Sequence, residues 1–305
     1  MPTRRTALAW LAGCLTLAAA SLPAAAQGAD RLKVVATFSI LGDMVRNVGG
    51  ERVEVTTLVG PNGDAHVYAP TPADGRRLTE AKIVFTNGLK FEGWIDRLVK
   101  SSGTKAAKIE ASQGVKPLKG EDHGHGHGHG GDDPHAWQSI ANARIYVANI
   151  RDALIAADAA GRSAYEANAA SYLKQLDALE AEVKSLVAGI PADRRRIITS
   201  HDAFRYFEAA YGIDFVSPQG VSTEAEASAK DVARIIQQIR RERIAAVFVE
   251  NVSDARLMER IAKETGARIG ARVYSDALSE ANGPAGTYID MMRHNIRAFS
   301  AALSS

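Results

Sequence analysis

The residues with the clearest capacity for chemistry are histidines, of which the chain has eight. His66, His135 and His201 each stand within two positions of an aspartate. Neutral imidazole is a common ligand of zinc and other transition metals. A lone loop histidine is usually only hydrated or hydrogen-bonded, so a metal site requires the fold to bring these three together. Because an unperturbed imidazole becomes protonated near pH ~6.5, we expect metal binding to weaken below that pH.

Thiolate ligands are missing from the mature chain that we predict. The single cysteine, Cys14, lies in residues 1–26, where a basic start, an apolar run and a small-residue end form the pattern of a secretory signal peptide. Zinc takes four ligands from thiolate, imidazole and carboxylate groups. Three histidines and one aspartate are therefore an available tetrahedral set.

The leader also predicts the compartment, which is the bacterial periplasm or the cell exterior. Residues 11–14 fit a lipoprotein cleavage box, but few apolar residues precede them, so lipid anchoring at Cys14 is the less favoured interpretation. Without Arg4 and Arg5, 35 of the 37 basic residues remain and equal the 35 acidic residues in number. A neutral chain has no overall attraction for nucleic acid or anionic membranes, so we expect neither as a partner.

Alternating strand and helix patterns make up most of the remaining chain. Predicted strands are the short apolar runs at 32–38, 53–59, 83–86, 196–200, 213–216, 246–249 and 268–271. Predicted helices are the segments at 40–48, 74–81, 91–100, 204–211, 229–241, 254–265 and 287–301. This alternation indicates an α/β fold with a parallel sheet of about four strands in each half.

A long helix is predicted between the two halves. Its apolar residues follow one another at alternating intervals of four and three, which gives one continuous stripe: Tyr165, Ala169, Tyr172, Leu176, Leu179, Val183 and Leu186. Ser163 and Glu166 have the spacing of a capping box at its start, and Gly189 and Pro191 mark its end. The helix would run for about 24 residues, or roughly 36 Å, and is a candidate strut between two lobes.

Ligands of open parallel sheets gather beyond the carboxyl ends of the strands. His66 follows the strand at 53–59, His201 directly follows 196–200, and Asp276 follows 268–271. His135 comes after a Gly/His/acidic tract within 111–133, which we predict to be a mobile loop because it has no apolar periodicity. The tract has four histidines that we expect to bind metal weakly and exchange it fast: His123, His125, His127 and His129. His294, on the last predicted helix, is expected to be a surface residue.

Four short motifs resemble signatures of one known family. In chain order they are DAHVYAPTP at 64–72, DPHAW at 133–137, TSHDAF at 199–204 and SDAL at 275–278. Together they resemble the metal-binding proteins of bacterial zinc and manganese ABC importers, over nearly the whole mature chain. The His-rich insert before the second motif fits this resemblance, whereas Ser139 departs from it, because the family often has a proline there.

The resemblance implies two α/β lobes, each with a four-stranded parallel sheet, joined by a long rigid helix, with the metal between them. The segments would be a signal peptide at 1–26, a first lobe at 27–157 with its His-rich loop at 121–130, a linking helix at 158–190 and a second lobe at 191–305. His66 and His135 would come from the first lobe, and His201 and Asp276 from the second. Zinc members typically have histidine at the third motif and manganese members glutamate, so His201 favours zinc.

The resulting prediction is a monomeric periplasmic zinc-binding protein that captures Zn²⁺ and delivers it to the inner-membrane permease of an ABC importer. A periplasmic metallochaperone is a further candidate partner. We expect no enzymatic activity and no catalytic residue. The alternatives are manganese import, a surface adhesin and a zinc hydrolase, the last disfavoured because four protein ligands leave no position for water. Candidate carboxylate partners of the histidines are Asp64, Asp133, Asp202, Glu224 and Glu250.

Overall fold

The computed structural model describes residues 31–120 and 131–304. The predicted signal peptide and the histidines at 123–129 therefore lie outside the described residues. Among the residues described, no helix is both long and apolar enough to span a membrane.

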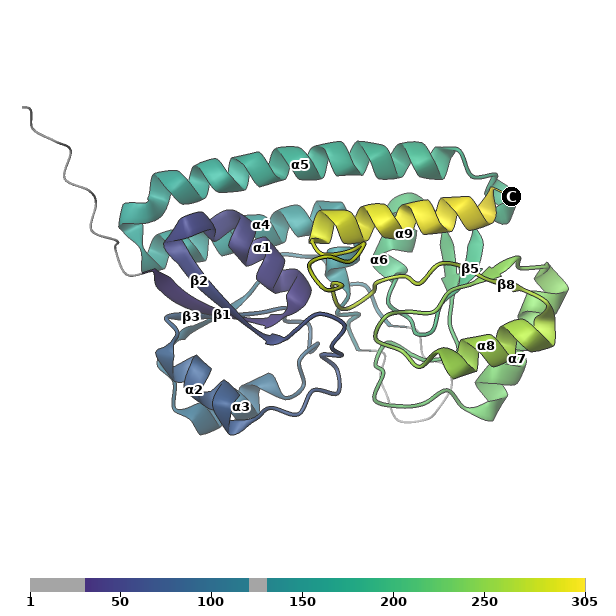
Figure 1. The fold of residues 1–305 in the computed structure, drawn as a ribbon, viewed down its shortest axis with the longest axis horizontal. Helices are drawn as coiled ribbons and strands as arrows, with labels where there is room; N and C mark the ends of the chain where they lie inside the picture. Colours follow the sequence, from purple (N-terminus) through teal and green to yellow (C-terminus); the bar gives the residue numbers. More distant parts are fainter. Residues whose placement is uncertain (1–30, 121–130, 305) are drawn as a thin grey trace, which may run out of the picture. The chain divides into compact units, whose positions relative to one another are not determined.

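Two parallel sheets of four strands each organise the chain, as predicted (Figure 1). The first has the order β2-β1-β3-β4 and comprises β1 (Leu32–Phe38), β2 (Val53–Val59), β3 (Ile83–Thr86) and β4 (Ala107–Glu110). The second has the equivalent order β6-β5-β7-β8 and comprises β5 (Arg196–Ile198), β6 (Asp214–Val216), β7 (Ala246–Val247) and β8 (Arg268–Ile269). We call the parts built on these sheets the first and second lobes. Since both have the same order, the carboxyl ends of their strands carry equivalent loops.

Helices connect the parallel strands, as crossover connections require. In the first lobe they are α1 (Ser39–Gly49), α2 (Pro72–Glu80) and α3 (Ile95–Ser102). In the second lobe they are α6 (Arg205–Tyr211), α7 (Ala229–Glu242) and α8 (Ala255–Thr265). Short 3₁₀ turns occur at Gly50–Arg52, Ala136–Gln138, Ala159–Gly161 and Ala192–Arg194. The third helix begins at Ile95, later than the predicted 91–100. A turn in which Gly88, Leu89 and Lys90 have positive φ angles comes first, and a second turn follows, in which the Ile95 N–H donates to the Glu92 carbonyl at 3.1 Å.

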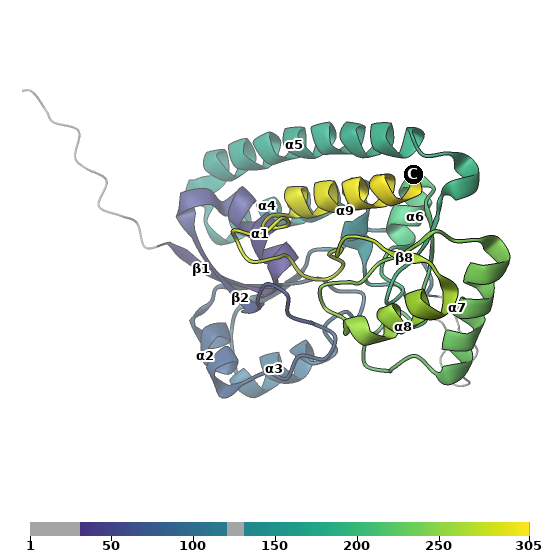
Figure 2. The ribbon, with the colours of Figure 1, turned by 45° about the vertical axis from the view of Figure 1, so that its right-hand side comes forward.

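Three longer helices line one side of both lobes (Figure 1, Figure 2). They are α4 (Ile140–Ala157), α5 (Arg162–Ala188) and α9 (Tyr288–Leu303). The 27-residue α5 packs on α1 and α4 of the first lobe and on α9, which follows the second sheet. The predicted stripe is buried along it, except that Val187 takes the last buried position in place of Leu186, which is only partly buried.

The predicted capping box at the start of α5 is wrong. The helix begins one residue before Ser163, at Arg162, and its N-cap Gly161 has no side chain to accept a hydrogen bond. Asp158 organises this corner instead, because its carboxylate accepts hydrogen bonds from the Gly161 N–H, the Arg52 guanidinium and the Tyr165 hydroxyl. Asp158, which precedes Ser163 in the chain, therefore provides the hydrogen bonds at this corner in place of the predicted capping box.

One hydrophobic core extends through both lobes. It includes Phe38 and Phe85 of the first sheet, Leu176 of α5, and Phe248 and Phe299 of the second lobe. A second, smaller cluster lies between the second sheet and helices α7 and α8. Since the lobes share apolar packing along α5 and α9, separating them would expose surface that costs about 25 cal/mol per Å².

Candidate metal centre

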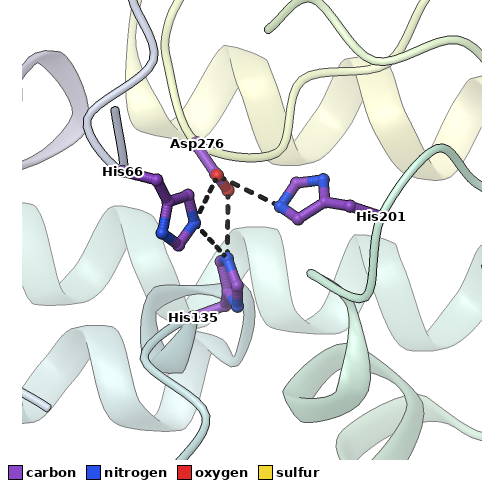
Figure 3. Close-up of side chains that lie close together, drawn as sticks. All are labelled: His66, His135, His201 and Asp276. Atoms are coloured by element: carbon purple, nitrogen blue, oxygen red, sulfur yellow. Dashed lines mark hydrogen bonds and ion pairs between the residues drawn. The ribbon is translucent and has the colours of Figure 1, made fainter. Parts of the chain in front are cut away.

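The structure brings the four predicted ligands to one point between the lobes (Figure 3). His66, His135, His201 and Asp276 each offer one ligand atom, and these four atoms lie within 4.8 Å of one another. His66 is 8% exposed, and the other three side chains are fully enclosed. An ion held here would therefore be shielded from bulk water.

Loops at the carboxyl ends of strands supply three of the four residues. His66 lies in the loop after β2, His201 lies in the loop after β5, and Asp276 lies in the connection between β8 and α9. His135 immediately precedes the 3₁₀ turn that leads to α4. The architecture of two parallel sheets explains this convergence, because both present the carboxyl ends of their strands to the seam between the lobes.

A repeated local device fixes two of these histidines. The Oδ1 atom of Asp64 accepts a hydrogen bond from the His66 N–H at 2.9 Å, and Oδ1 of Asp133 accepts one from the His135 N–H at 2.9 Å. An aspartate that bonds the backbone two residues later forms an Asx turn. The D-x-H spacing in both motifs is therefore a turn that presents an imidazole.

The separations between ligand atoms suit a small tetrahedral ion. Nε2 of His66 lies 3.3 Å from Asp276 Oδ2 and 3.3 Å from His135 Nε2. Nε2 of His201 lies 3.2 Å from Asp276 Oδ2, and Nε2 of His135 lies 3.5 Å from Oδ1. Four ligands at ~2.0–2.2 Å from a tetrahedral zinc ion would stand about 3.3–3.6 Å apart. The four separations above match that spacing, and all pairs of ligand atoms lie within 4.8 Å. The residues present therefore fit a four-coordinate transition metal.

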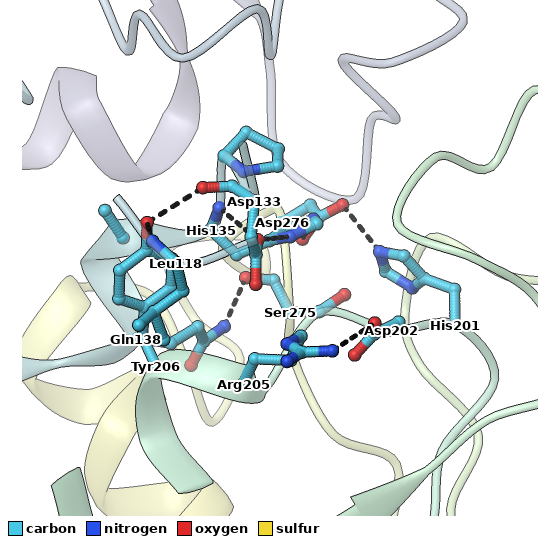
Figure 4. A network of polar contacts seen from close by, with 12 residues as sticks. Leu118, Asp133, His135, Gln138, His201, Asp202, Arg205, Tyr206, Ser275 and Asp276 are labelled. Carbon is cyan, nitrogen blue, oxygen red and sulfur yellow. Dashed lines mark hydrogen bonds and ion pairs between the residues drawn. The ribbon is translucent and has the colours of Figure 1, made fainter. Parts of the chain in front are cut away.

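Carboxylates contact the far side of two imidazoles, and Figure 4 shows the first of them, Asp133 beside His135. The Nδ1 atom of His135 lies 2.7 Å from Asp133 Oδ1, and that of His201 lies 2.6 Å from Glu250 Oε2. Glu250 also accepts the backbone N–H of His201 through Oε1 at 2.9 Å. A proton kept on Nδ1 by a carboxylate leaves Nε2 free as the metal ligand.

The other three candidate carboxylate partners have different contacts. Asp64 bonds the backbone of His66, as described above. Asp202 lies 3.8 Å from the Arg205 guanidinium (Figure 4), and Glu224 is exposed. The prediction of carboxylate partners is therefore supported by the geometry for Asp133 and Glu250 only.

The carboxylates of the site favour protonated imidazoles when no metal ion is bound. Burial acts to lower the pKa of His135, but the carboxylates of Asp276 and Asp133 outweigh it and raise that pKa to about 9. Against the same effect of burial, Glu250 and Asp276 hold the pKa of His201 well above its usual value. Burial acts to raise the pKa of Asp276, yet the neighbouring imidazoles hold it well below its usual value. The three carboxylates therefore favour a positive charge among the imidazoles, which a proton or a metal cation can supply.

Aromatic and amide side chains support the ligands from outside. The Trp137 indole and the Gln138 amide both donate to the Ser275 carbonyl, at 2.9 and 2.8 Å, next to Asp276. The ring of Phe91 lies edge-on to the His66 imidazole, with centroids 4.7 Å apart. The sequence offered a motif for Trp137 but no signal that singled out Gln138 or Phe91, whose roles depend on tertiary contacts.

The remaining described histidine is separate from this centre. His294 lies on α9, where its Nε2 is 2.8 Å from the Arg272 carbonyl oxygen and its ring contacts Tyr274. His294 is partly buried, so it is not the fully exposed surface residue that we expected. It takes no part in the metal centre.

Two equivalent lobes on a long shared helix, with four buried ligands between them, define a metal-binding solute-binding protein. The chain matches the family described as zinc-uptake complex component A, periplasmic (ZnuA), over residues 34–302, and it belongs to this family.

Relatives and solved structures agree with this assignment. The manganese-binding lipoprotein MntA of Halalkalibacterium halodurans is 36% identical over 276 residues, which cover 90% of this chain and 89% of that protein. The manganese ABC transporter substrate-binding lipoprotein PsaA of Streptococcus pneumoniae is 32% identical over 283 residues, or 90% of each chain. The periplasmic zinc-binding protein TroA of Treponema pallidum superposes with a TM-score of 0.84 at 29% identity, covering 90% of this chain and all of that one. A Mn-bound periplasmic metal-binding protein of Candidatus Liberibacter asiaticus gives a TM-score of 0.81 at 28% identity with the same coverage.

The family settles the class of function. The chain is the metal-binding component of an ABC importer, and its partner is the membrane-embedded part of that transporter. It is not an enzyme, so the zinc hydrolase alternative is rejected. The predicted family and fold class are confirmed.

Proposed function

We propose that this protein captures Zn²⁺ in the periplasm and delivers it, as a monomer, to the permease of an ABC importer. The observation that carries the choice of zinc is the imidazole of His201 in the third ligand position. With it, the four converging groups are three imidazole nitrogens, which are neutral once a metal is bound, and the single carboxylate of Asp276. Imidazole suits zinc, whereas manganese prefers carboxylate and water oxygens.

The ligand separations and the outer carboxylates support the same choice. The Asp276 oxygens lie 3.2 Å from His201 Nε2 and 3.5 Å from His135 Nε2, and all four ligand atoms lie within 4.8 Å of one another, which leaves room for one small ion. Asp133 and Glu250 orient two imidazoles for this ion, and together with Asp276 they supply three negative charges around it. The His-rich segment would act as a weak accessory binder, and a periplasmic metallochaperone is a candidate second partner.

Manganese is the second candidate, because the names of MntA and PsaA assign manganese to two relatives. The carboxylate of Asp276 could offer both oxygens to a larger ion. Raw affinity follows the Irving–Williams order, so tighter binding of zinc in vitro would not by itself identify the cargo. The metal that the protein acquires in the periplasm distinguishes the two candidates. Protein purified from the periplasm of cells grown with equal Zn²⁺ and Mn²⁺ should contain zinc by mass spectrometry. Manganese in the purified protein would overturn the zinc proposal.

The role of His201 has its own test. A glutamate at this position alone would face both Glu250 and Asp276, so we pair His201→Glu with Glu250→Gln, which keeps the total charge of the native metal-bound site, in which His201 is neutral. The zinc-to-manganese affinity ratio should fall by about 10-fold or more relative to the Glu250→Gln control, because a hard oxygen replaces a nitrogen. An unchanged ratio would remove His201 as the basis for zinc selection.

A further inference from the structure

The metal centre is enclosed, yet an importer component must load and unload its cargo. Two sets of polar contacts join the lobes around it. The buried set includes the bonds from Trp137 and Gln138 to the Ser275 carbonyl and the bond from the Leu278 N–H to the Ser39 hydroxyl at 2.9 Å. These contacts lie within the shared core and would be costly to break, because a polar group left unpaired there loses its hydrogen bond without regaining water.

The second set is only partly buried and lies at the rim. The Asn251 side-chain amide donates to Asn62 Oδ1 at 3.1 Å, and the Thr223 hydroxyl donates to Asp64 Oδ2 at 2.6 Å. Asp64 and Thr223 also line a hollow of about 500 Å³ together with Gln219. Solvent can therefore reach this set and replace its hydrogen bonds, which makes it the easier of the two to open.

Asp64 connects the rim directly to a ligand. Its Oδ1 atom accepts the N–H of His66, while its Oδ2 atom accepts the hydroxyl of Thr223 from the opposite lobe. Inside its own lobe, the same loop is held by Trp94, whose indole N–H donates to the Ala65 carbonyl at 2.8 Å. One carboxylate thus couples the position of the His66 loop to the second lobe.

His66 is also the ligand closest to solvent. It is the member of the four with measurable exposure, at 8%. His135 and His201 each contact a carboxylate outside the four ligands, Asp133 and Glu250 respectively, whereas the His66 ring packs against Phe91. Displacement of the His66 loop would therefore open the centre while the other three ligands keep their supports.

We propose that the Asp64–Thr223 hydrogen bond is a latch that holds the His66 loop closed and sets the rate at which metal enters and leaves. The proposal rests on metal binding by the four ligands and does not depend on which metal is bound. Opening the latch should lower the barrier for both directions of exchange, so both rates should rise while the equilibrium affinity changes little.

The test is Thr223→Val in the full mature chain, which removes the hydroxyl but keeps the side-chain shape and leaves the bond from Asp64 to His66. Stopped-flow measurements would give the association rate of the metal and its dissociation rate into excess chelator, with Zn²⁺ and with Mn²⁺. We expect both rates to rise about 3- to 10-fold, because one partly exposed hydrogen bond changes the equilibrium between the open and closed loop by about that factor. The Kd should change less than twofold.

Two matched variants complete the design. Thr223→Ser keeps the hydroxyl and should retain the rates of the native protein. It therefore separates loss of the hydrogen bond from any disturbance of the local fold by valine. Thr79→Val makes the same change on the exposed face of α2, where the hydroxyl donates to the Arg76 carbonyl, and should leave both rates unchanged. Unaltered rates in Thr223→Val, or a weaker Kd with an unaltered association rate, would overturn the latch. Because both ions are measured, a failure of the zinc proposal would leave this result interpretable.

Discussion

The pH dependence of metal binding gives a sharp test of the electrostatics of the centre. A metal ion must displace the proton from each imidazole that is protonated in the free protein. The sequence alone predicts this competition near pH ~6.5, the usual value for histidine. In the structure the pKa of His135 is about 9 and that of His201 is well above its usual value, so the competition extends into the alkaline range.

The size of the effect follows from counting protons. Releasing the proton of His135 at pH 7, against a pKa of about 9, costs about 3 kcal/mol of binding free energy. With His201 protonated as well, two protons leave per metal, and the apparent affinity should rise about 100-fold per pH unit between pH 7 and pH 8. Titrations against a chelator of known pH dependence would give this slope, and calorimetry in buffers of different ionisation enthalpy would count the protons.

Glu250→Gln is the matched perturbation. It keeps the size of the side chain but removes one of the two negative charges that raise the pKa of His201, leaving that of Asp276. The slope should then fall towards about 10-fold per pH unit, because one proton fewer is displaced at neutral pH. A slope near zero in the native protein, or an equal slope in Glu250→Gln, would refute the assignment of two protonated imidazoles in the metal-free site.

Three further predictions follow from the same centre. Metal at about 1,000 times its Kd should stabilise the fold by about 4 kcal/mol, and His66→Ala should shrink the metal-induced rise in Tm; an equal rise would remove His66 from the ligands. The metal-free protein should lose stability as pH rises from ~6.5 through the folded pKa of His135, about 9, because a raised histidine pKa stabilises only while the proton is bound; Tm measured against pH in the presence of chelator checks this sign. Deletion of residues 122–131 should leave one tight site and abolish weak ones, measured by zinc titration, and loss of the tight site would place it in the deleted segment.

Much of the ligand loop geometry was accessible from the sequence. The positions of His66, His201 and Asp276 after predicted strands placed them at carboxyl ends of sheets, and the resemblance of four motifs to one family implied that both lobes share one site. The stripe of α5 was equally clear, because its 3.6-residue periodicity persists over the whole helix. These predictions succeed because each depends on the residue pattern within a single segment of the chain.

What the sequence could not supply depends on contacts across long separations. Glu250 was one of five candidate carboxylates, but its pairing with His201 could not be predicted, because it lies 49 residues away, at an isolated bridge to Val273 just beyond the end of β7. Strand β4 was missed because it is an edge strand with exposed charged positions and only one partly buried apolar side chain. Helix α4 was also missed, although Tyr146, Ile150 and Leu154 have helical spacing and are fully buried.

The enclosure of the ligands has a consequence for which ions can enter at all. A centre that shows only one slightly exposed ligand to solvent requires an incoming ion to give up its entire hydration shell. Mg²⁺ dehydrates reluctantly and normally keeps several water molecules, and Ca²⁺ requires six to eight oxygens. Three imidazoles and one carboxylate cannot replace what either ion would lose. Dehydration therefore rejects the common hard cations before any discrimination among transition metals begins.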